Sequence, residues 1–155
     1  MTYRVLVSTD LGGDPDDIQS LYRLILYSDV LKVEGITSCT GPGSTPSAGL
    51  IRHWIQLVDV EHLRCNGFPE LMTEQVLLDS VVQGATTAGR PASGKESDGS
   101  CKIIDRAMVD SDEILWVPVW GYGCRAGAAR CTRDCGADPD QLHRVVEYSE
   151  RSGCS

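Results

Sequence analysis

Hydrophobic and polar positions along the chain follow two periods, one typical of strands and one typical of helices. The run from Tyr3 to Thr9 is apolar and β-branched, which predicts a buried strand. Pro15, with Asp14 before it as a candidate N-cap, predicts the start of a helix. Apolar residues then recur at helical spacing on one face: Ile18, Leu21, Tyr22 and Ile25.

The same alternation continues further along the chain. Residues 31–38 predict a second strand, and residues 62–65 a short third one. Between them, Pro46 and Ser47 open a predicted helix with the inward side chains Leu50, Ile51, Trp54 and Leu57. Residues 73–83 predict another helix, with the inward side chains Val76, Leu77, Val81 and Val82.

Residues 84–100 are rich in Gly, Ser and Thr and predict a long loop. A helix is expected after it, with one apolar side formed by Ile103, Ile104, Ala107 and Met108. Residues 113–121 predict the last clear strand, on which Trp116 and Trp120 share one face and are expected in the core.

Alternating strands and helices predict an α/β fold, a mainly parallel sheet with flanking helices. Turn-rich segments at 10–17, 39–43, 66–70 and 120–123 each follow an expected strand. In open α/β sheets, ligands bind beyond the carboxyl ends of the strands. The segment 10–17 therefore lies where this architecture builds its sites.

Charge and composition limit the kinds of partner that the chain could bind. The 155 residues suffice for one domain, and the formal net charge of −8 argues against nucleic acid and against an anionic membrane surface. A cation or a neutral polar ligand remains compatible with it. No apolar run approaches the roughly 20 residues that span a bilayer. No signal peptide is visible, so the chain is expected to be cytoplasmic, although related proteins can be secreted. A homo-oligomer is left open.

Two weaker patterns concern the end of the chain. The seven cysteines are expected to be free thiols, as is usual in a cytosolic protein. The four late ones are spaced too widely for a typical zinc site: Cys124, Cys131, Cys135 and Cys154. A G-x-G-x-x-A pattern after the last predicted strand, with acids further along the chain, would suit dinucleotide binding: Gly121, Gly123, Ala126, Asp138 and Asp140. Such a pattern usually opens a domain, whereas this one comes at its end. The next strand, which should carry the ribose-binding acid, is missing from the sequence pattern.

Four aspartates fall within eight positions, at Asp10, Asp14, Asp16 and Asp17. Helix capping by Asp14 and the helix dipole account for three of them and would stabilise by about 1–2 kcal/mol. Asp10 and the neighbouring glycines are left unexplained. Calcium prefers several oxygen ligands on a flexible loop. From these residues alone, capping and cation binding both stay open, whereas the spacing excludes an EF-hand loop.

The segments VSTDLGGDPDD and VEGITSCTGPG resemble the opening motifs of the inosine-uridine nucleoside hydrolases. The nucleoside-hydrolase-like domain of the cellulose-binding Sde182 group is more similar. Its members share the counterparts of STDLGGDPDDIQSLYRLILYS, GFPE, ESDGS and LWVPVWG, in this order, from about Arg4 to Gly121. The resemblance implies a Rossmann-like, nucleoside-hydrolase-like α/β fold.

The resemblance also implies roles for single residues. Asp10 matches the calcium ligand that takes a proton from the attacking water, and Asp17 matches a second calcium ligand. Asp16 matches the acid that contacts the ribose hydroxyls, and Asp14 belongs to the longer turn of the Sde182 group. Further substrate-binding candidates lie in two loops: Thr40, Glu96 and Asp98. Thr40 and Gly41 stand where the hydrolases carry a sugar-binding asparagine, which is absent here.

The function so implied is calcium-dependent hydrolysis of a nucleoside-type N-glycosidic bond, with a small sugar or nucleoside-like ligand. The alternatives are a non-catalytic carbohydrate-binding protein and an inactive truncated product. Residues 1–121 are expected to be the N-terminal part of the domain. Residues 122–155 are expected to be a divergent tail, frameshifted or disordered, because their composition changes abruptly to Cys, Gly, Ala and Arg.

Overall fold

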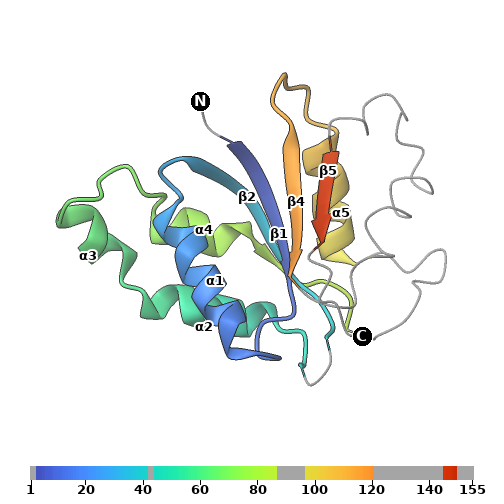
Figure 1. Ribbon diagram of the computed structural model, residues 1–155, viewed down its shortest axis with the longest axis horizontal. Coiled ribbons are helices and arrows are strands. Elements are labelled where there is room, and N and C mark those ends of the chain that lie inside the picture. The colour runs from blue at the N-terminus through green and yellow to red at the C-terminus, as the bar shows by residue number, and fades with distance from the viewer. Residues whose placement is uncertain (1–2, 42–43, 87–96, 121–144, 150–155) are drawn as a thin grey trace.

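Five parallel strands form one sheet in the order β3-β2-β1-β4-β5 (Figure 1). The computed structural model describes residues 3–41, 44–86, 97–120 and 145–149. The strands are β1 (Tyr3–Thr9), β2 (Leu31–Ser38), β3 (Val81–Val82), β4 (Leu115–Trp120) and β5 (Val145–Ser149). The central strand is β1, which pairs with β2 on one side and with β4 on the other. The predicted parallel α/β sheet is confirmed.

Helices cover both faces of the sheet (Figure 1). The helices are α1 (Pro15–Leu26), α2 (Ala48–Leu57), α3 (Val60–Cys65), α4 (Glu74–Ser80) and α5 (Asp98–Ala107). Side chains of α1, α2 and α4 share one apolar cluster with the sheet, whereas α5 packs in a second cluster with β1 and β4. None of the described helices is long and apolar enough to cross a membrane.

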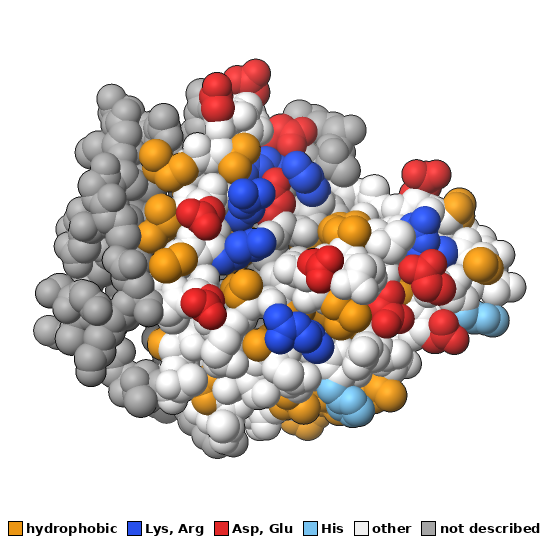
Figure 2. All heavy atoms as spheres, turned by 180° about the vertical axis from the view of Figure 1, so that it is seen from behind, with side chains coloured by type: hydrophobic (Ala, Val, Ile, Leu, Met, Phe, Trp, Pro, Cys, Tyr) orange, Lys and Arg blue, Asp and Glu red, His pale blue; other side chains and the backbone are white. Residues whose placement is uncertain are grey.

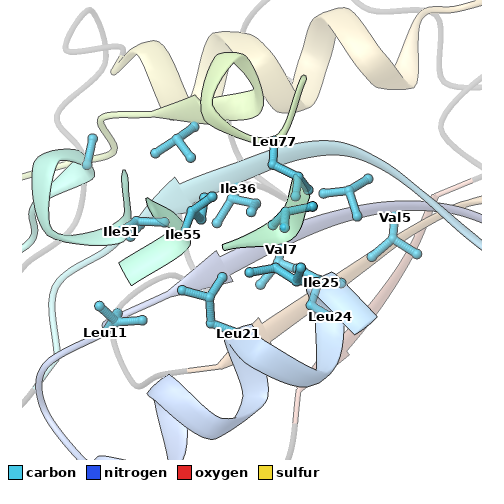
Figure 3. Packing of buried hydrophobic residues seen from close by; sticks show 14 residues of the cluster. Val5, Val7, Leu11, Leu21, Leu24, Ile25, Ile36, Ile51, Ile55 and Leu77 are labelled. Carbon is cyan, nitrogen blue, oxygen red and sulfur yellow. The ribbon is translucent and has the colours of Figure 1, made fainter. Parts of the chain in front are cut away.

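The pleat of β1 divides its side chains between these two clusters. Val5 and Val7 lie in the larger cluster, beside α1 and α2 (Figure 3). Leu6 lies in the smaller cluster with Ile103 of α5. This is the alternation expected of a strand with helices on both sides. Each fully buried aliphatic side chain stabilises the fold by roughly 1.5–3 kcal/mol.

Side-chain caps begin four of the five described helices: α2, α3, α4 and α5. The Ser47 hydroxyl accepts from Leu50 N (3.1 Å) at the start of α2, and Thr73 caps α4 in the same way. Ser97 and Ser100 form a capping box at the start of α5. These caps satisfy backbone N–H groups that a helix leaves without partners. They explain why α5 begins inside the segment 84–100, which the sequence predicts as loop.

Two predicted elements are wrong. Residues 62–65 form part of helix α3 instead of a strand, because Asp59 caps this helix by accepting from His62 N (3.2 Å) and Val60 is buried beneath it. The predicted helix 73–83 ends early, since its last two valines form the edge strand β3 beside β2. Several side chains expected inward are exposed: Leu57, Val76, Met108 and Trp116.

At the amino end of the sheet, Arg4 of β1 forms a buried ion pair with Glu34 of β2. Arg4 Nε and Nη2 each lie 2.9 Å from a Glu34 carboxylate oxygen. The same guanidinium donates to Arg106 O at the end of α5 (2.6 Å) and to Glu113 O before β4 (3.3 Å). One side chain thus links β1, β2, α5 and the approach to β4.

Part of the predicted tail 122–155 is described as strand β5, which pairs with β4 from Leu115↔Val145 to Val119↔Ser149. The four late cysteines and the G-x-G-x-x-A pattern lie outside the described residues. Cys39, Cys65 and Cys101 are thiols rather than disulfides, as expected. The division at residue 121 stays a prediction.

Candidate functional site

The carboxyl ends of three neighbouring strands meet around Asp10. Cys39 N, after β2, donates to Thr9 O at the end of β1 (2.7 Å). Asp10 N donates to Trp120 O at the end of β4 (3.2 Å). Asp10 therefore leaves the central strand with strands bonded on both sides, the position where α/β sheets build ligand sites.

A tight turn leads from Asp10 into α1. Gly13 N donates to Asp10 O (3.1 Å), and Gly12 has φ +106°, a conformation that favours glycine. Leu11 anchors this turn, because its side chain is buried in the larger apolar cluster. The turn reverses the chain so that the first residues of α1 return to the end of β1.

The first turn of α1 presents its acids differently from the predicted cap. Asp14 has the N-cap position, but its side chain makes no capping hydrogen bond, so that part of the prediction is wrong. The Asp17 carboxylate instead accepts from the backbone N–H of Asp14, the reverse half of a capping box. Asp14 and Asp16 are exposed, whereas Asp17 is buried.

Asp10 and Asp17 form a pair of buried carboxylates. Asp10 is 8% exposed and Asp17 is 9% exposed. Burial and, next, the negative charge of Asp10 raise the pKa of Asp17 to about 6, although the hydrogen bond from Asp14 N–H acts in the opposite direction. Two like charges held together in a buried position cost free energy. A bound cation would offset that cost.

The loop after β2 approaches the same carboxylate. A Cβ atom built on Gly41 would lie 1.5 Å from Asp10 Oδ2, so the Gly41 backbone packs directly against the Asp10 side chain. Ser44 Oγ accepts from Gly41 N (2.9 Å) and donates to Gly41 O (3.2 Å), which holds this loop. Thr40, beside Gly41, is half-buried.

Thr9, directly before Asp10, carries a buried polar atom. Its side chain lies on the same face of β1 as Val7, the face on which α1 packs, because strand side chains alternate. Thr9 Oγ1 is buried and has no hydrogen-bond partner within the described part of the chain. Buried hydroxyls are usually hydrogen-bonded, so this one is an exception.

The two segments that the sequence predicts near the site are placed only in part. Asp98 is exposed in the first turn of α5, which lies at the carboxyl ends of β2 and β3, since Gly99 N donates to Gln83 O (2.9 Å). Asp98 and Asp10 therefore lie at the same edge of the sheet, but Asp98 is beside β2 and β3, whereas Asp10 follows β1. Glu96 lies outside the described residues.

Sequence reasoning locates the acids but not their neighbours. Nothing distinguishes Thr9 in the sequence except its place directly before Asp10. The contact of Gly41 with Asp10 depends on how closely two loops approach. The sequence resemblance places Gly41 in a loop near the site but does not predict this contact.

The donor set suits a hard cation in kind, although it is small. Calcium prefers carboxylate oxygens and completes its shell with backbone carbonyls and waters. Within residues 3–41, 44–86 and 97–120, however, no group of three or more His, Cys, Asp or Glu side chains could hold a metal ion. Asp10 and Asp17 therefore fit as part of such a site.

Comparison with known proteins places this chain in a family. The family model described as "Cellulose-binding Sde182, nucleoside hydrolase-like domain" matches residues 4–129, well over half of the chain. The chain belongs to this family. The motifs that resembled the Sde182 group lie in the matched range, and that resemblance is confirmed.

A solved structure supports the same placement within the Sde182 nucleoside-hydrolase-like family. It is a nucleoside hydrolase-related hypothetical protein from Saccharophagus degradans that is associated with carbohydrate metabolism. It is 28% identical in sequence, with a TM-score of 0.80 over 96% of this chain. The chain spans only 38% of the length of that protein. No curated protein matches. The roles predicted for single residues stay predictions.

Proposed function

We propose that this domain binds calcium at Asp10 and Asp17 and hydrolyses a nucleoside-type N-glycosidic bond. The observation that carries the proposal is the pair of buried, mutually repelling carboxylates at the carboxyl end of the central strand. Two ionised carboxylates held close together destabilise the fold when no cation is present, and they can serve as ligands when one binds. Membership of a nucleoside-hydrolase-like family supports the reaction class.

Each acid has a role in this proposal. Asp10 accepts the proton of the attacking water, and Asp17 shares the cation with it. A bound calcium ion lowers the pKa of a coordinated water and orients vicinal sugar hydroxyls. Asp16 and Asp14 face solvent beside the pair, where a sugar would approach. Negative charge at this edge favours an oxocarbenium-like transition state.

A hydrolysis assay with the full chain tests the proposal. Inosine, uridine and a nitrophenyl riboside are offered with calcium, and released sugar is measured. Asp10→Asn keeps the size of the side chain and removes its basicity, so kcat should fall about 10²–10⁴-fold. Asp79→Asn, an exposed change on α4, serves as the matched control and should leave the rate unchanged. Equal rates for wild type and Asp10→Asn would refute the role of Asp10.

Carbohydrate binding without turnover is the second candidate. It is favoured by the description of the family as cellulose-binding and by the small donor set among the described residues. Isothermal titration with cello-oligosaccharides separates the two functions. Binding that Asp16→Ala weakens, with no sugar released from any substrate, would favour this candidate over the hydrolase.

A further inference from the structure

We propose that Gly41 is a positioning residue. Because it has no side chain, the Asp10 carboxylate can pack against its backbone, and this contact fixes the orientation of the carboxylate. This inference rests on the proposed function of Asp10. The structural basis is one contact: a Cβ atom at Gly41 would lie 1.5 Å from Asp10 Oδ2, 2.4 Å from its Cγ and 2.7 Å from its Cβ.

Space, and not backbone conformation, requires a glycine here. The described glycines with positive φ are Gly12 and Gly67, and Gly41 is not among them. An alanine could therefore adopt the backbone of Gly41 without strain. Its methyl group would occupy the place of the Asp10 carboxylate.

Both backbones are held, so the carboxylate moves more easily than they do. On the side of Gly41, Ser44 Oγ bonds both the N–H and the carbonyl of Gly41, and Cys39 N is bonded to Thr9 O. On the other side, Asp10 N is bonded to Trp120 O, and Asp10 O accepts from Gly13 N. An added methyl would turn the Asp10 carboxylate out of its present position. Because rotation does not move Asp10 Cβ, which would lie 2.7 Å from the methyl, the two loops would also have to move apart.

Other close glycine contacts in the described chain touch structural groups instead. A Cβ at Gly84 would meet the backbone carbonyl Ser38 O at 1.8 Å, and one at Gly99 would meet Thr37 Oγ1 at 2.0 Å. Gly41 differs because its neighbour is the carboxylate proposed to accept a proton. A misplacement of about 1 Å at such a group can cost about a hundredfold in rate.

A double-mutant cycle tests the contact itself. Gly41→Ala is made in the wild-type chain and in Asp10→Gly, where the space is vacated, and unfolding by urea is measured without calcium. Gly41→Ala should lower the unfolding midpoint of the wild type and leave that of Asp10→Gly nearly unchanged. Gly49→Ala is the control, because its Cβ would meet only Ser47 Oγ, at 3.5 Å.

Steady-state kinetics distinguish a positioning role of Gly41 from a purely structural one. With substrate and calcium, Gly41→Ala should lower kcat about tenfold or more and change KM less than about threefold. Gly84→Ala tests the alternative, since it disturbs a structural contact and should lose stability without this selective loss of kcat.

The possible outcomes separate the two proposals. If Gly41→Ala destabilises Asp10→Gly as much as it destabilises the wild type, or if the double variant fails to fold, the methyl group clashes with something other than Asp10 and the inference is wrong. A selective loss of kcat in Gly84→Ala as well would also overturn it. If the wild type neither binds calcium nor releases sugar, the proposed function fails, while the stability cycle still decides the contact.

Discussion

At the scale of single residues, Asp17 couples the site to the stability of the fold. Its pKa in the fold is about 6, above its ordinary value of 3.8, because burial and the charge of Asp10 disfavour the ionised form. The folded state therefore holds this proton more tightly than the unfolded state. The stability that Asp17 contributes is present below pH 3.8 and is lost as the pH rises through about 6.

Asp17→Asn should consequently stabilise the metal-free protein at neutral pH. The amide keeps the size of the side chain and its acceptor for Asp14 N–H, but it cannot ionise. The gain should be about 2–3 kcal/mol near pH 7.5 and should vanish near pH 4, as measured by urea unfolding with a chelator present. Asp16→Asn, at an exposed position of the same turn, is the control and should change the free energy by less than about 0.5 kcal/mol. A gain that does not depend on pH would contradict this explanation.

At the scale of elements, the ion pair of Arg4 and Glu34 joins strands and helix at the end of the sheet opposite the site. Their side chains are 4% and 5% exposed. Burial raises the pKa of Glu34, but hydrogen bonds from Arg4 and Lys32 outweigh it and leave that pKa below 4.5. The stability that Glu34 contributes is thus present above pH 4.5 and is lost as the pH falls through its lowered pKa in the fold.

Glu34→Gln should destabilise the protein by about 3–5 kcal/mol near pH 7, because it leaves the Arg4 charge buried and only partly paired. The loss should shrink in acid, where wild-type Glu34 is itself protonated. Urea unfolding at both pH values measures it. The other partner of Glu34 is Lys32, and the Lys32 side chain is 61% exposed. Lys32→Gln should therefore lower the free energy of unfolding by less than about 1 kcal/mol. Equal losses for the two variants would show that the buried pair is not what links these elements.

The same scale shows what the sequence can and cannot predict. Strands β1, β2 and β4 and helix α1 are long and periodic enough to be read from the chain. Strand β3 has two residues and exists because β2 offers an edge to pair with, which no local period reveals. In the site, a dense acidic motif identifies Asp10 and Asp17. The contact of Gly41 and the partnerless hydroxyl of Thr9 depend on tertiary approach, so they become visible only in the fold.

At the scale of the whole molecule, most described acids are exposed, whereas Asp10 and Asp17 are buried. The chain carries a formal net charge of −8, and on the face shown in Figure 2 the described Lys and Arg side chains lie among Asp and Glu side chains. Exposed acids of this kind are solvated and cost little. The buried pair at Asp10 and Asp17 is different, because water cannot screen it. Cation binding at this pair should therefore affect the stability of the whole domain.

Calcium should raise the unfolding midpoint of the full chain near neutral pH. A ligand that binds only the folded state at about 100 times its Kd adds about 2.7 kcal/mol to the free energy of unfolding. The effect should weaken near pH 5, because below a pKa of about 6 a proton on Asp17 competes with the ion. Thermal unfolding in calcium or in magnesium measures the shift, and magnesium should give less because it demands stricter geometry. The double variant Asp10→Asn and Asp17→Asn should show no shift. A calcium shift that survives in the double variant would place the ion elsewhere and remove the physical basis of the proposed hydrolase site.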